Sequence, residues 1–477
     1  MIKSNSMKWL LPLTVSLLPF ALPAQNVTQQ LQKAFQQFES DSQLKHAISS
    51  LYVIDAKTGQ VVFDKNAQVG LAGASTQKII TATTAFELLG KGYRYATQFG
   101  YQGSITGRKL NGRIYVLASG DPTLGSWRYE STNETGFTNR ILKAIKGLKI
   151  DTADYMLFVE DRKFEVNNIP DGWIWQDIGN YYGAGAAALN WRENQYDIIL
   201  KSGKDIGDKV EITDIRPYNY FSQEIESKLS AAAKGSGDNA YIYLPLGTST
   251  AIIKGTIPLN ENRFTISGAV ANPGHEFQSR MIDTIKKAGI TVLFDTHPML
   301  TIADDFPSVY TNKGTVFYTE YSPSLDSIIY WFLKKSINLY GEALIKTFAY
   351  EKQGFGSTDS GVAIVRKFWK DKGLDDEELN IYDGSGLSPL NRITTHSQVE
   401  VLKYARTKDW FPYFYDALPE YNSMKMKSGT ISDVKGFCGY HKAKDGKEYI
   451  FSFLVNNYSG KTSGVVNKMY KVLDELK

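Results

Sequence analysis

The strongest constraint on the fold is that the two ends of the chain carry complementary pieces of one α+β unit. Residues 27–89 show the patterns of a helix, two strands and a second helix. Residues 437–476 show two strands, joined at the hairpin signal Asp445-Gly446, and a final helix. We therefore expect the two ends to complete one domain. The individual elements predicted are helices over 27–38, 75–89, 325–348, 361–372 and 465–476, and strands over 50–55, 60–63, 437–441 and 449–455.

The middle of the chain has a different texture. Between residues 94 and 311, short strand-like runs alternate with Gly, Asp and Asn turns, without a repeat or a low-complexity tract. We expect residues 25–93 and 312–477 to form one domain, interrupted at 94–311 by a β-rich insertion of one or two subdomains. With 477 residues and 42% hydrophobic content, the chain can bury more than one core.

The N-terminal 24 residues have the features of an export signal. Lys3 and Lys8 give a positive start, residues 9–22 are mostly apolar, and Ala24 offers a small residue for cleavage. The apolar stretch is shorter than the roughly 20 residues that span a bilayer, and no cysteine follows it for a lipid anchor. We expect cleavage and export to the periplasm without a transmembrane anchor in the mature chain. A retained amphipathic anchor is the alternative.

Charge and cysteine content exclude several classes of protein. Without the two leader lysines, 52 of the 54 basic residues remain, against 50 acidic ones. Because this balance is nearly neutral, nucleic acid is not an expected partner. The single cysteine, Cys438, excludes a disulfide framework within the chain and a cysteine-rich zinc site. The five histidines are scattered, and no metal or cofactor is expected. The number of histidines alone does not exclude a Ser-His-Asp triad, but the sequence contains no Gly-x-Ser-x-Gly motif to support one.

A serine and a lysine three residues apart, Ser75 and Lys78, form the first candidate for chemistry. Helical spacing brings the two side chains to one face, with their Cβ atoms about 5–6 Å apart. The lysine can take the serine proton only when it is neutral, so its pKa must fall from 10.4 to roughly 7–8, at a cost of about 4 kcal/mol. The same spacing occurs at Ser42–Lys45 and Ser432–Lys435, where a solvated polar pair is the simpler interpretation.

Two further short segments have residue types suited to the same chemistry. Ser336-Ile337-Asn338, in a non-helical loop, can point a hydroxyl and an amide into one cleft, although Ser131-Thr132-Asn133 has the same pattern. Lys427-Ser428-Gly429-Thr430 would place a cation and a hydroxyl at a substrate carboxylate. There Gly429 leaves room for a ligand backbone and the Thr430 N–H is available to an oxyanion. Lys201-Ser202-Gly203 repeats that tripeptide. Each segment alone is weak, but the three in this order point to a serine-nucleophile enzyme.

Together the segments resemble the active-site set of penicillin-recognising serine enzymes, Ser-x-x-Lys, Ser-x-Asn and Lys-Thr-Gly, with serine here in place of threonine. Ser75 and Ser336 are 261 positions apart. This separation is similar to that in the D-alanyl-D-alanine carboxypeptidase/endopeptidase branch, low-molecular-mass penicillin-binding proteins with a large insertion between the first two motifs. Further segments resemble that branch, at 120–124, 172–177 and 383–388. The resemblance implies a serine β-lactamase/DD-peptidase-like domain of the α+β class, with an antiparallel sheet flanked by helices.

The resemblance also implies a role for each matching residue. The substrate would be a D-Ala-D-Ala stem peptide or a cross-link of peptidoglycan, and β-lactams would acylate the same serine. Ser75 would be the nucleophile, Lys78 its base, and Ser336 the group that passes a proton to the leaving D-alanine. Asn338 would bind the substrate amide, and Lys427 and Ser428 would bind its carboxylate. The N–H groups of Ser75 and Thr430 would bind the oxyanion. Asp161 resembles the insertion's acidic contact to a free amine of the substrate, and a solvated acid is the equal alternative.

Some positions depart from the family pattern. Gly73 stands where a proline is common, and Pro389 stands where an arginine often contacts the substrate side chain, with Arg392 three residues further on. These departures leave the side-chain specificity open. Two other functions also stay open, namely a β-lactamase of the same fold and a non-catalytic cell-wall-binding relative.

Overall fold

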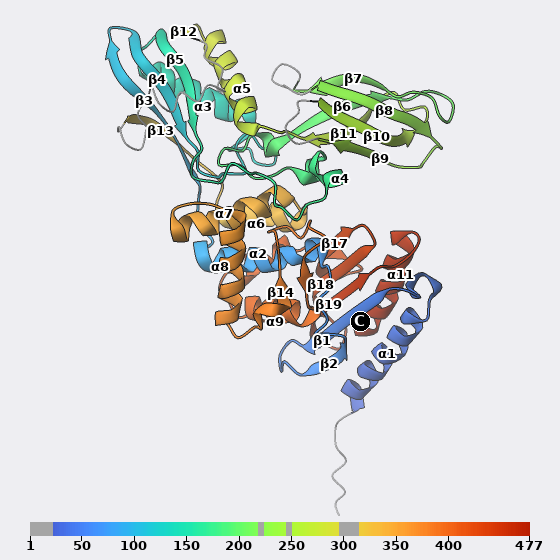
Figure 1. Cartoon of the computed structure of the whole chain (residues 1–477). Helices are drawn as coiled ribbons and strands as arrows, with labels where there is room; N and C mark the ends of the chain where they lie inside the picture. Colours follow the sequence, from blue (N-terminus) through green and yellow to red (C-terminus); the bar gives the residue numbers. More distant parts are fainter. Residues whose placement is uncertain (1–21, 218–223, 245–249, 295–313) are drawn as a thin grey trace, which may run out of the picture.

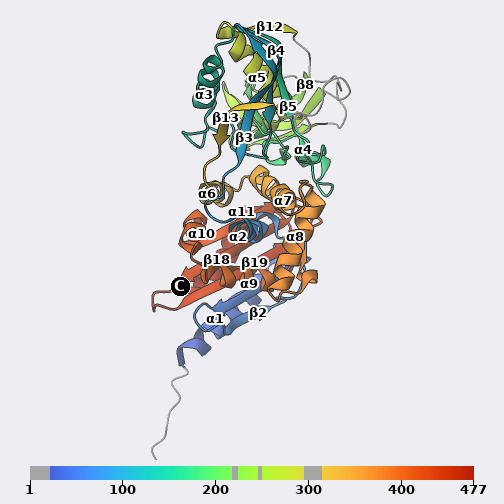
Figure 2. The ribbon, with the colours of Figure 1, turned by 90° about the vertical axis from the view of Figure 1, so that its left-hand side faces the viewer.

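The computed structural model describes residues 22–217, 224–244, 250–294 and 314–477. It has a body, built from residues 22–93 and 322–477, and two lobes that lie together beyond one end of it (Figures 1 and 2). Residues 1–21 of the predicted leader lie outside the described residues, and the first helix begins at Leu22. Across the part of the chain that is described, no helix is long and apolar enough to cross a bilayer.

The body alternates helices and strands at both ends of the chain. Its helices are α1 (Leu22–Glu39), α2 (Lys78–Leu89), α6 (Leu325–Lys334), α7 (Asn338–Gln353), α8 (Thr358–Asp371), α9 (Thr395–Arg406), α10 (Phe411–Ala417) and α11 (Thr462–Leu473). Its strands are β1 (Ile48–Asp55), β2 (Val61–Lys65), β14 (Leu379–Asn380), β15 (Arg392–Ile393), β16 (Glu420–Tyr421), β17 (Met424–Ile431), β18 (Val434–Lys442) and β19 (Glu448–Asn456).

One antiparallel sheet joins the two ends of the chain. Its strand order is β16-β17-β18-β19-β1-β2, and β1 pairs with β19 from Ile48 opposite Asn456 to Asp55 opposite Tyr449. Figure 1 shows the N-terminal strands in blue beside the C-terminal strands in red, with α1 and α11 on one face and α2 and α9 on the other. The predicted α+β class, with an antiparallel sheet flanked by helices, is confirmed.

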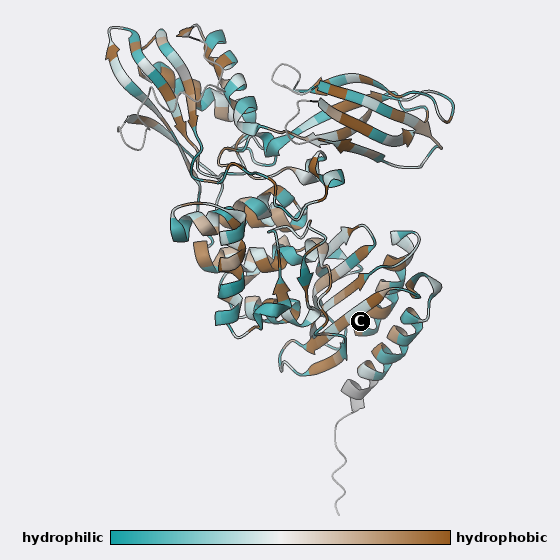
Figure 3. Cartoon of the chain, viewed as in Figure 1, coloured by the Kyte–Doolittle hydropathy of each residue, from teal (hydrophilic) through white to brown (hydrophobic). Residues whose placement is uncertain are grey.

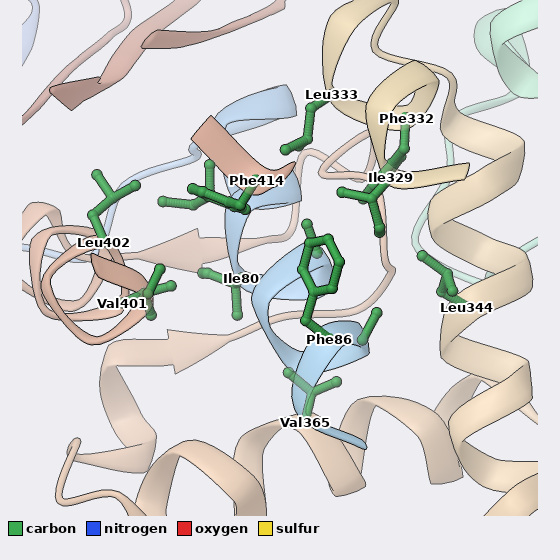
Figure 4. Close-up of a cluster of buried hydrophobic side chains, with 14 of the residues drawn as sticks. Ile80, Phe86, Ile329, Phe332, Leu333, Leu344, Val365, Val401, Leu402 and Phe414 are labelled. Atoms are coloured by element: carbon green, nitrogen blue, oxygen red, sulfur yellow. The ribbon is translucent and has the colours of Figure 1, made fainter. Parts of the chain in front are cut away.

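Helix α2 runs through the centre of the body. Every residue from Lys78 to Phe86 is buried, and apolar side chains of α6, α7, α8, α9 and α10 surround Ile80 and Phe86 (Figure 4). The helix ends at Gly90, whose φ of 79° and N–H bond to the Phe86 carbonyl stop it as the sequence predicts. Burial on all sides fixes both the depth and the rotation of the turn that precedes α2.

The two lobes have separate hydrophobic cores, and hydrophobic residues run along their strands in Figure 3. The first lobe has a mixed sheet, β12-β5-β4-β3-β13, covered by helices α3 and α5. The second has the sheets β8-β10-β9 and β11-β6-β7, and α4 lies close to its strand β9. Strand β13 lies beyond residue 311 but pairs with β3, so it belongs to the sheet of the first lobe.

The bounds of the lobe elements are as follows. The first lobe contains β3 (Ala96–Thr106), β4 (Lys109–Leu117), α3 (Glu134–Gly147), β5 (Thr152–Glu160), α5 (Pro273–Lys287), β12 (Thr291–Phe294) and β13 (Thr315–Tyr321). The second contains β6 (Gln195–Lys201), β7 (Glu211–Arg216), β8 (Glu224–Ala232), β9 (Asn239–Tyr243), β10 (Thr250–Pro258) and β11 (Phe264–Ala269), and α4 (Trp175–Ile178) lies between the two lobes in sequence.

Candidate active site

The turn that carries Ser75 is a 3-10 helix over Ala74–Gln77, immediately before α2. It is held from both sides: the Thr76 hydroxyl donates to the Gly73 carbonyl at 2.6 Å, and the Gln77 side-chain amide donates to the Asp383 carbonyl at 2.7 Å. Ala74 has a φ of 47°, in the left-handed region that costs a residue with a Cβ about 1–2 kcal/mol. These contacts present Ser75 at the buried end of α2.

Lys78 lies one turn further on and is fully buried. Its Nζ lies 2.8 Å from Ser75 Oγ, 2.6 Å from Asn338 Oδ1 and 2.7 Å from the Ser385 carbonyl oxygen. Burial lowers the pKa of Lys78 well below its ordinary value, and the positive charge of Lys427 lowers it further. A neutral amine has two N–H groups and one lone pair. The two acceptors, Asn338 Oδ1 and the Ser385 carbonyl, match the N–H groups, so the lone pair faces the Ser75 hydroxyl.

Asn338 has a fixed amide orientation. Its Nδ2 donates to the carbonyl of Tyr182 at 2.7 Å, which leaves Oδ1 toward Lys78. Asn338 begins α7, and Tyr182 belongs to the segment between α4 and β6. The inserted region therefore contacts the second motif directly.

Ser336 lies in the break between α6 and α7. The sequence predicted helix over 325–348, but the helix stops at Lys334 and restarts at Asn338, with Ser336 at a φ of 59°. This left-handed residue turns its hydroxyl toward β17, where Lys427 Nζ donates to Ser336 Oγ at 2.9 Å. Lys427 is buried, and burial lowers its pKa to about 7.

Gly429 allows β17 to lie against the nucleophile turn. A Cβ atom at this position would lie 2.5 Å from the Gly73 carbonyl oxygen, 2.8 Å from the Thr76 nitrogen and 2.9 Å from the Ser75 nitrogen. All three atoms are backbone and cannot rotate away. The close approach places the backbone of Thr430 beside that of Ser75.

Replacement of Gly429 by alanine should therefore slow acylation of Ser75 by a fluorescent penicillin more than tenfold and lower the melting temperature. Overpacking against backbone typically costs about 1–3 kcal/mol. Gly147→Ala is the matched control, because a Cβ there meets no atom within 4 Å. Wild-type acylation by Gly429→Ala would show that β17 does not need this approach.

A cleft of about 420 Å³ opens over these residues. Ser75, Ser336, Asn338 and Thr430 line it from the body, and the insertion contributes a wall that includes Arg128, Ile174, Gln176, Asp177, Tyr181, Tyr182, Gln195 and Tyr241. Asp161 is exposed, just after β5, and is not among the described residues that line the cleft. Asp177 is the acid that the cleft contains, and burial raises its pKa.

The loop after β14 is organised by the buried carboxylate of Asp383. Its two oxygens accept hydrogen bonds from both the body and the insertion: from Trp173 Nε1, Gly386 N, Ser388 N, Asn391 Nδ2 and Gln77 Nε2, at 2.7–3.2 Å. The same loop supplies the Ser385 carbonyl to Lys78. Among the described residues, no group of three or more His, Cys, Asp or Glu side chains is arranged to hold a metal ion.

Comparison with known proteins agrees with this geometry. A model of the D-Ala-D-Ala carboxypeptidase 3 (S13) family matches residues 28–475. The chain belongs to this family. The predicted family and the predicted activity class, a serine-type D-Ala-D-Ala carboxypeptidase, are confirmed.

Several relatives span most of this S13 carboxypeptidase. A D-alanyl-D-alanine carboxypeptidase from Actinomadura sp. is 25% identical over 88% of this chain and 80% of its own length. D-alanyl-D-alanine carboxypeptidase DacB from Haemophilus influenzae is 23% identical over 84% of this chain and 83% of its own. The crystal structure of penicillin binding protein 4 from Haemophilus influenzae has the same fold, with a TM-score of 0.75 at 20% identity, over 95% of this chain and 99% of that one. A second structure of that protein holds a β-lactam, with a TM-score of 0.70 at 18% identity, over 94% and 99%.

Proposed function

We propose that this S13 carboxypeptidase hydrolyses D-Ala-D-Ala stem peptides of peptidoglycan, and D-Ala-containing cross-links, through an acyl-enzyme on Ser75. The observation that carries the proposal is the environment of Lys78. Two carbonyl-type acceptors take the two N–H groups of a neutral amine, and burial lowers the pKa of Lys78 well below its ordinary value, which favours the neutral form. The lone pair is then free to accept the proton of the Ser75 hydroxyl as it attacks.

The remaining groups fit the later steps. Ser336, held by Lys427, passes the proton to the nitrogen of the leaving D-alanine. Asn338 has one Nδ2 hydrogen on Tyr182, and its second hydrogen binds the substrate amide carbonyl. The N–H groups of Ser75 and Thr430 stabilise the oxyanion, each by about 3 kcal/mol. Water then hydrolyses the acyl-enzyme.

Binding of the substrate carboxylate is assigned to strand β17. Lys427 and Ser428 bind the C-terminal carboxylate, and Gly429 leaves space for the substrate backbone. Asp161 stays a prediction as a contact to a free amine of the stem peptide. Its exposed place after β5 gives no support, and Asp177 is the acidic residue inside the cleft.

We also propose acylation by β-lactams, export of the mature chain to the periplasm, and the division into a peptidase domain (25–93 and 312–477) and an insertion (94–311). The β-lactam held by the Haemophilus influenzae relative supports the first. The charge and apolar pattern of residues 1–24 supports the second. The strand pairing between the two ends supports the third, although β13 continues the sheet of the first lobe beyond residue 311.

Replacement of Ser75 by alanine should abolish both covalent labelling by a fluorescent penicillin and release of D-alanine. Labelling is read on a denaturing gel, and products from defined muropeptides are read by mass spectrometry. We expect loss of one D-alanine from a pentapeptide monomer and cleavage of a cross-linked dimer by the wild type. Persistent labelling in the variant would remove Ser75 as the nucleophile.

The same assays separate the other functions. A penicilloyl adduct that is lost within seconds would indicate a β-lactamase, because a carboxypeptidase of this kind should hold the adduct far longer than a turnover of peptide. A wild-type protein that binds wall fragments but releases no D-alanine would indicate a non-catalytic relative. Cleavage of the monomer alone would limit the activity to the carboxypeptidase reaction.

A further inference from the structure

Lys435 lies on the strand next to β17, and none of the steps above uses it. It stands on β18 directly opposite Thr430 of β17, and its Nζ donates to Thr430 Oγ1 at 2.8 Å. Lys435 is 8% exposed, and its ammonium lies 4.7 Å from the centre of the Phe437 ring. It is the lysine of the Ser432–Lys435 spacing that the sequence interpretation set aside.

This ammonium has no anionic partner among the described residues. Within the described residues, no carboxylate oxygen lies within 4.0 Å of Lys435 Nζ. A buried charge without a counter-charge is destabilising, so proteins seldom keep one unless it has a use. Burial lowers the pKa of Lys435 to about 8, so most molecules carry the charge at pH 7.

The hydroxyl that Lys435 holds faces the cleft. Thr430 is exposed and lines the cleft beside Ser75, whereas Lys435, on the neighbouring strand, is not among the described residues that line the cleft. Because the Lys435 ammonium occupies a lone pair of Thr430 Oγ1, the hydroxyl hydrogen must point elsewhere, and the open side is the cleft. Lys427, a second buried lysine, is close enough for the charge of Lys435 to lower its pKa. Two buried lysines, neither paired with a carboxylate among the described residues, thus contact residues 428–430.

We propose that Lys435 is a positioning residue for the substrate carboxylate: it orients the Thr430 hydroxyl as a donor and adds a second positive charge beside β17. This inference rests on the proposed function, since it requires a substrate whose terminal carboxylate lies at β17. The carboxylate of D-Ala-D-Ala, or that of a penicillin, would accept the Thr430 hydroxyl while Lys427 and Lys435 balance its charge. A charge-assisted hydrogen bond of this kind changes binding about 10- to 100-fold.

The test compares a ligand that has the carboxylate with one that lacks it. The first is an acyl-D-Ala-D-Ala peptide, measured by kcat/KM, and the second is an acyl-D-alanine boronic acid, which bonds to Ser75 without a leaving residue, measured by its inhibition constant. Lys435→Met should lower kcat/KM for the peptide about 10- to 100-fold, mainly through KM, and leave boronate inhibition within about threefold. Lys435→Arg should restore most of the loss.

A matched control removes a different lysine of the same strand. Lys442→Met deletes a largely exposed ammonium at the far end of β18, and both ligands should behave as with the wild type. Equal weakening of peptide and boronate by Lys435→Met would reduce Lys435 to structural support, and no weakening of either would overturn the proposal. If the wild type does not cleave the peptide, the proposed function fails. The Lys435 comparison then proceeds on acylation by penicillin, which carries the carboxylate, and is decided by the same outcomes.

Discussion

Lys78→Met should acylate with penicillin about 10³-fold more slowly than the wild type while keeping a cooperative thermal transition. General-base catalysis contributes about 10²- to 10⁴-fold. Methionine fills nearly the same volume but has no lone pair positioned to accept the Ser75 proton. The rate is measured as a time course of fluorescent labelling, and the fold is checked by melting temperature.

Lys346→Met is the matched control for this experiment. Lys346, on α7, is fully buried like Lys78 on α2. Its Nζ donates to the carbonyls of Asn167 and Ala186 rather than to a reacting group. We expect this variant to melt at a lower temperature and to acylate within a few-fold of the wild type. If both variants acylate equally slowly, the loss reflects a general disturbance of the buried interior. If Lys78→Met acylates at the wild-type rate, another residue must be the base, and Lys427 is the first candidate.

Local patterns in the sequence were sufficient for the parts of the site that are near one another in the chain. The three-residue spacing of Ser75 and Lys78 predicted their contact, because a helical turn fixes that distance. The hairpin signal at Asp445-Gly446 likewise predicted the pairing of β18 with β19, and the apolar face of residues 75–89 predicted α2. Each of these features depends on fewer than about 20 residues.

Contacts between distant segments could not be predicted in this way. The Ser385 carbonyl at Lys78 and the Tyr182 carbonyl at Asn338 are backbone atoms, which every residue has, so residue type gives no signal. Lys435 was interpreted as part of a solvated polar pair, because only the β17–β18 register shows that it stands opposite Thr430. The apolar pattern of residues 325–348 did not show the break at Ser336, because that pattern continues through it and the left-handed φ of a serine is not visible in periodicity. Only the Ser-x-Asn motif predicted a non-helical loop there.

Asp383→Asn should destabilise the body by about 3 kcal/mol and abolish most acylation, although the change only replaces one carboxylate oxygen by an NH₂ group of similar size. Both carboxylate oxygens are surrounded by donors: Oδ2 accepts from Trp173 Nε1 and Ser388 N, and Oδ1 accepts from Gly386 N and the side chains of Asn391 and Gln77. Either orientation of an asparagine places its NH₂ group against at least two N–H donors. The donors on one side of residue 383 must then lose their hydrogen bonds while they stay buried.

Catalysis should suffer with stability because the loop that Asp383 organises also holds the base. The Ser385 carbonyl accepts from Lys78, and the Asp383 carbonyl accepts from Gln77 of the nucleophile turn. Thermal unfolding and the acylation time course measure the two effects in parallel. Asp371→Asn is the control, since that carboxylate pairs with Lys367 on the exposed face of α8, and it should leave both measurements unchanged.

A second variant separates the role of the insertion from that of the loop. Trp173→Phe removes only the donor that comes from the inserted region and leaves the loop donors at residues 386, 388 and 391 in place. If the loop alone positions Lys78, this variant should keep acylation within about threefold, at a cost in stability near 1 kcal/mol for one lost hydrogen bond. If it instead acylates as slowly as Asp383→Asn, the insertion itself holds the catalytic loop in place. Wild-type stability and acylation in Asp383→Asn would contradict the proposal that the Asp383 carboxylate organises this loop.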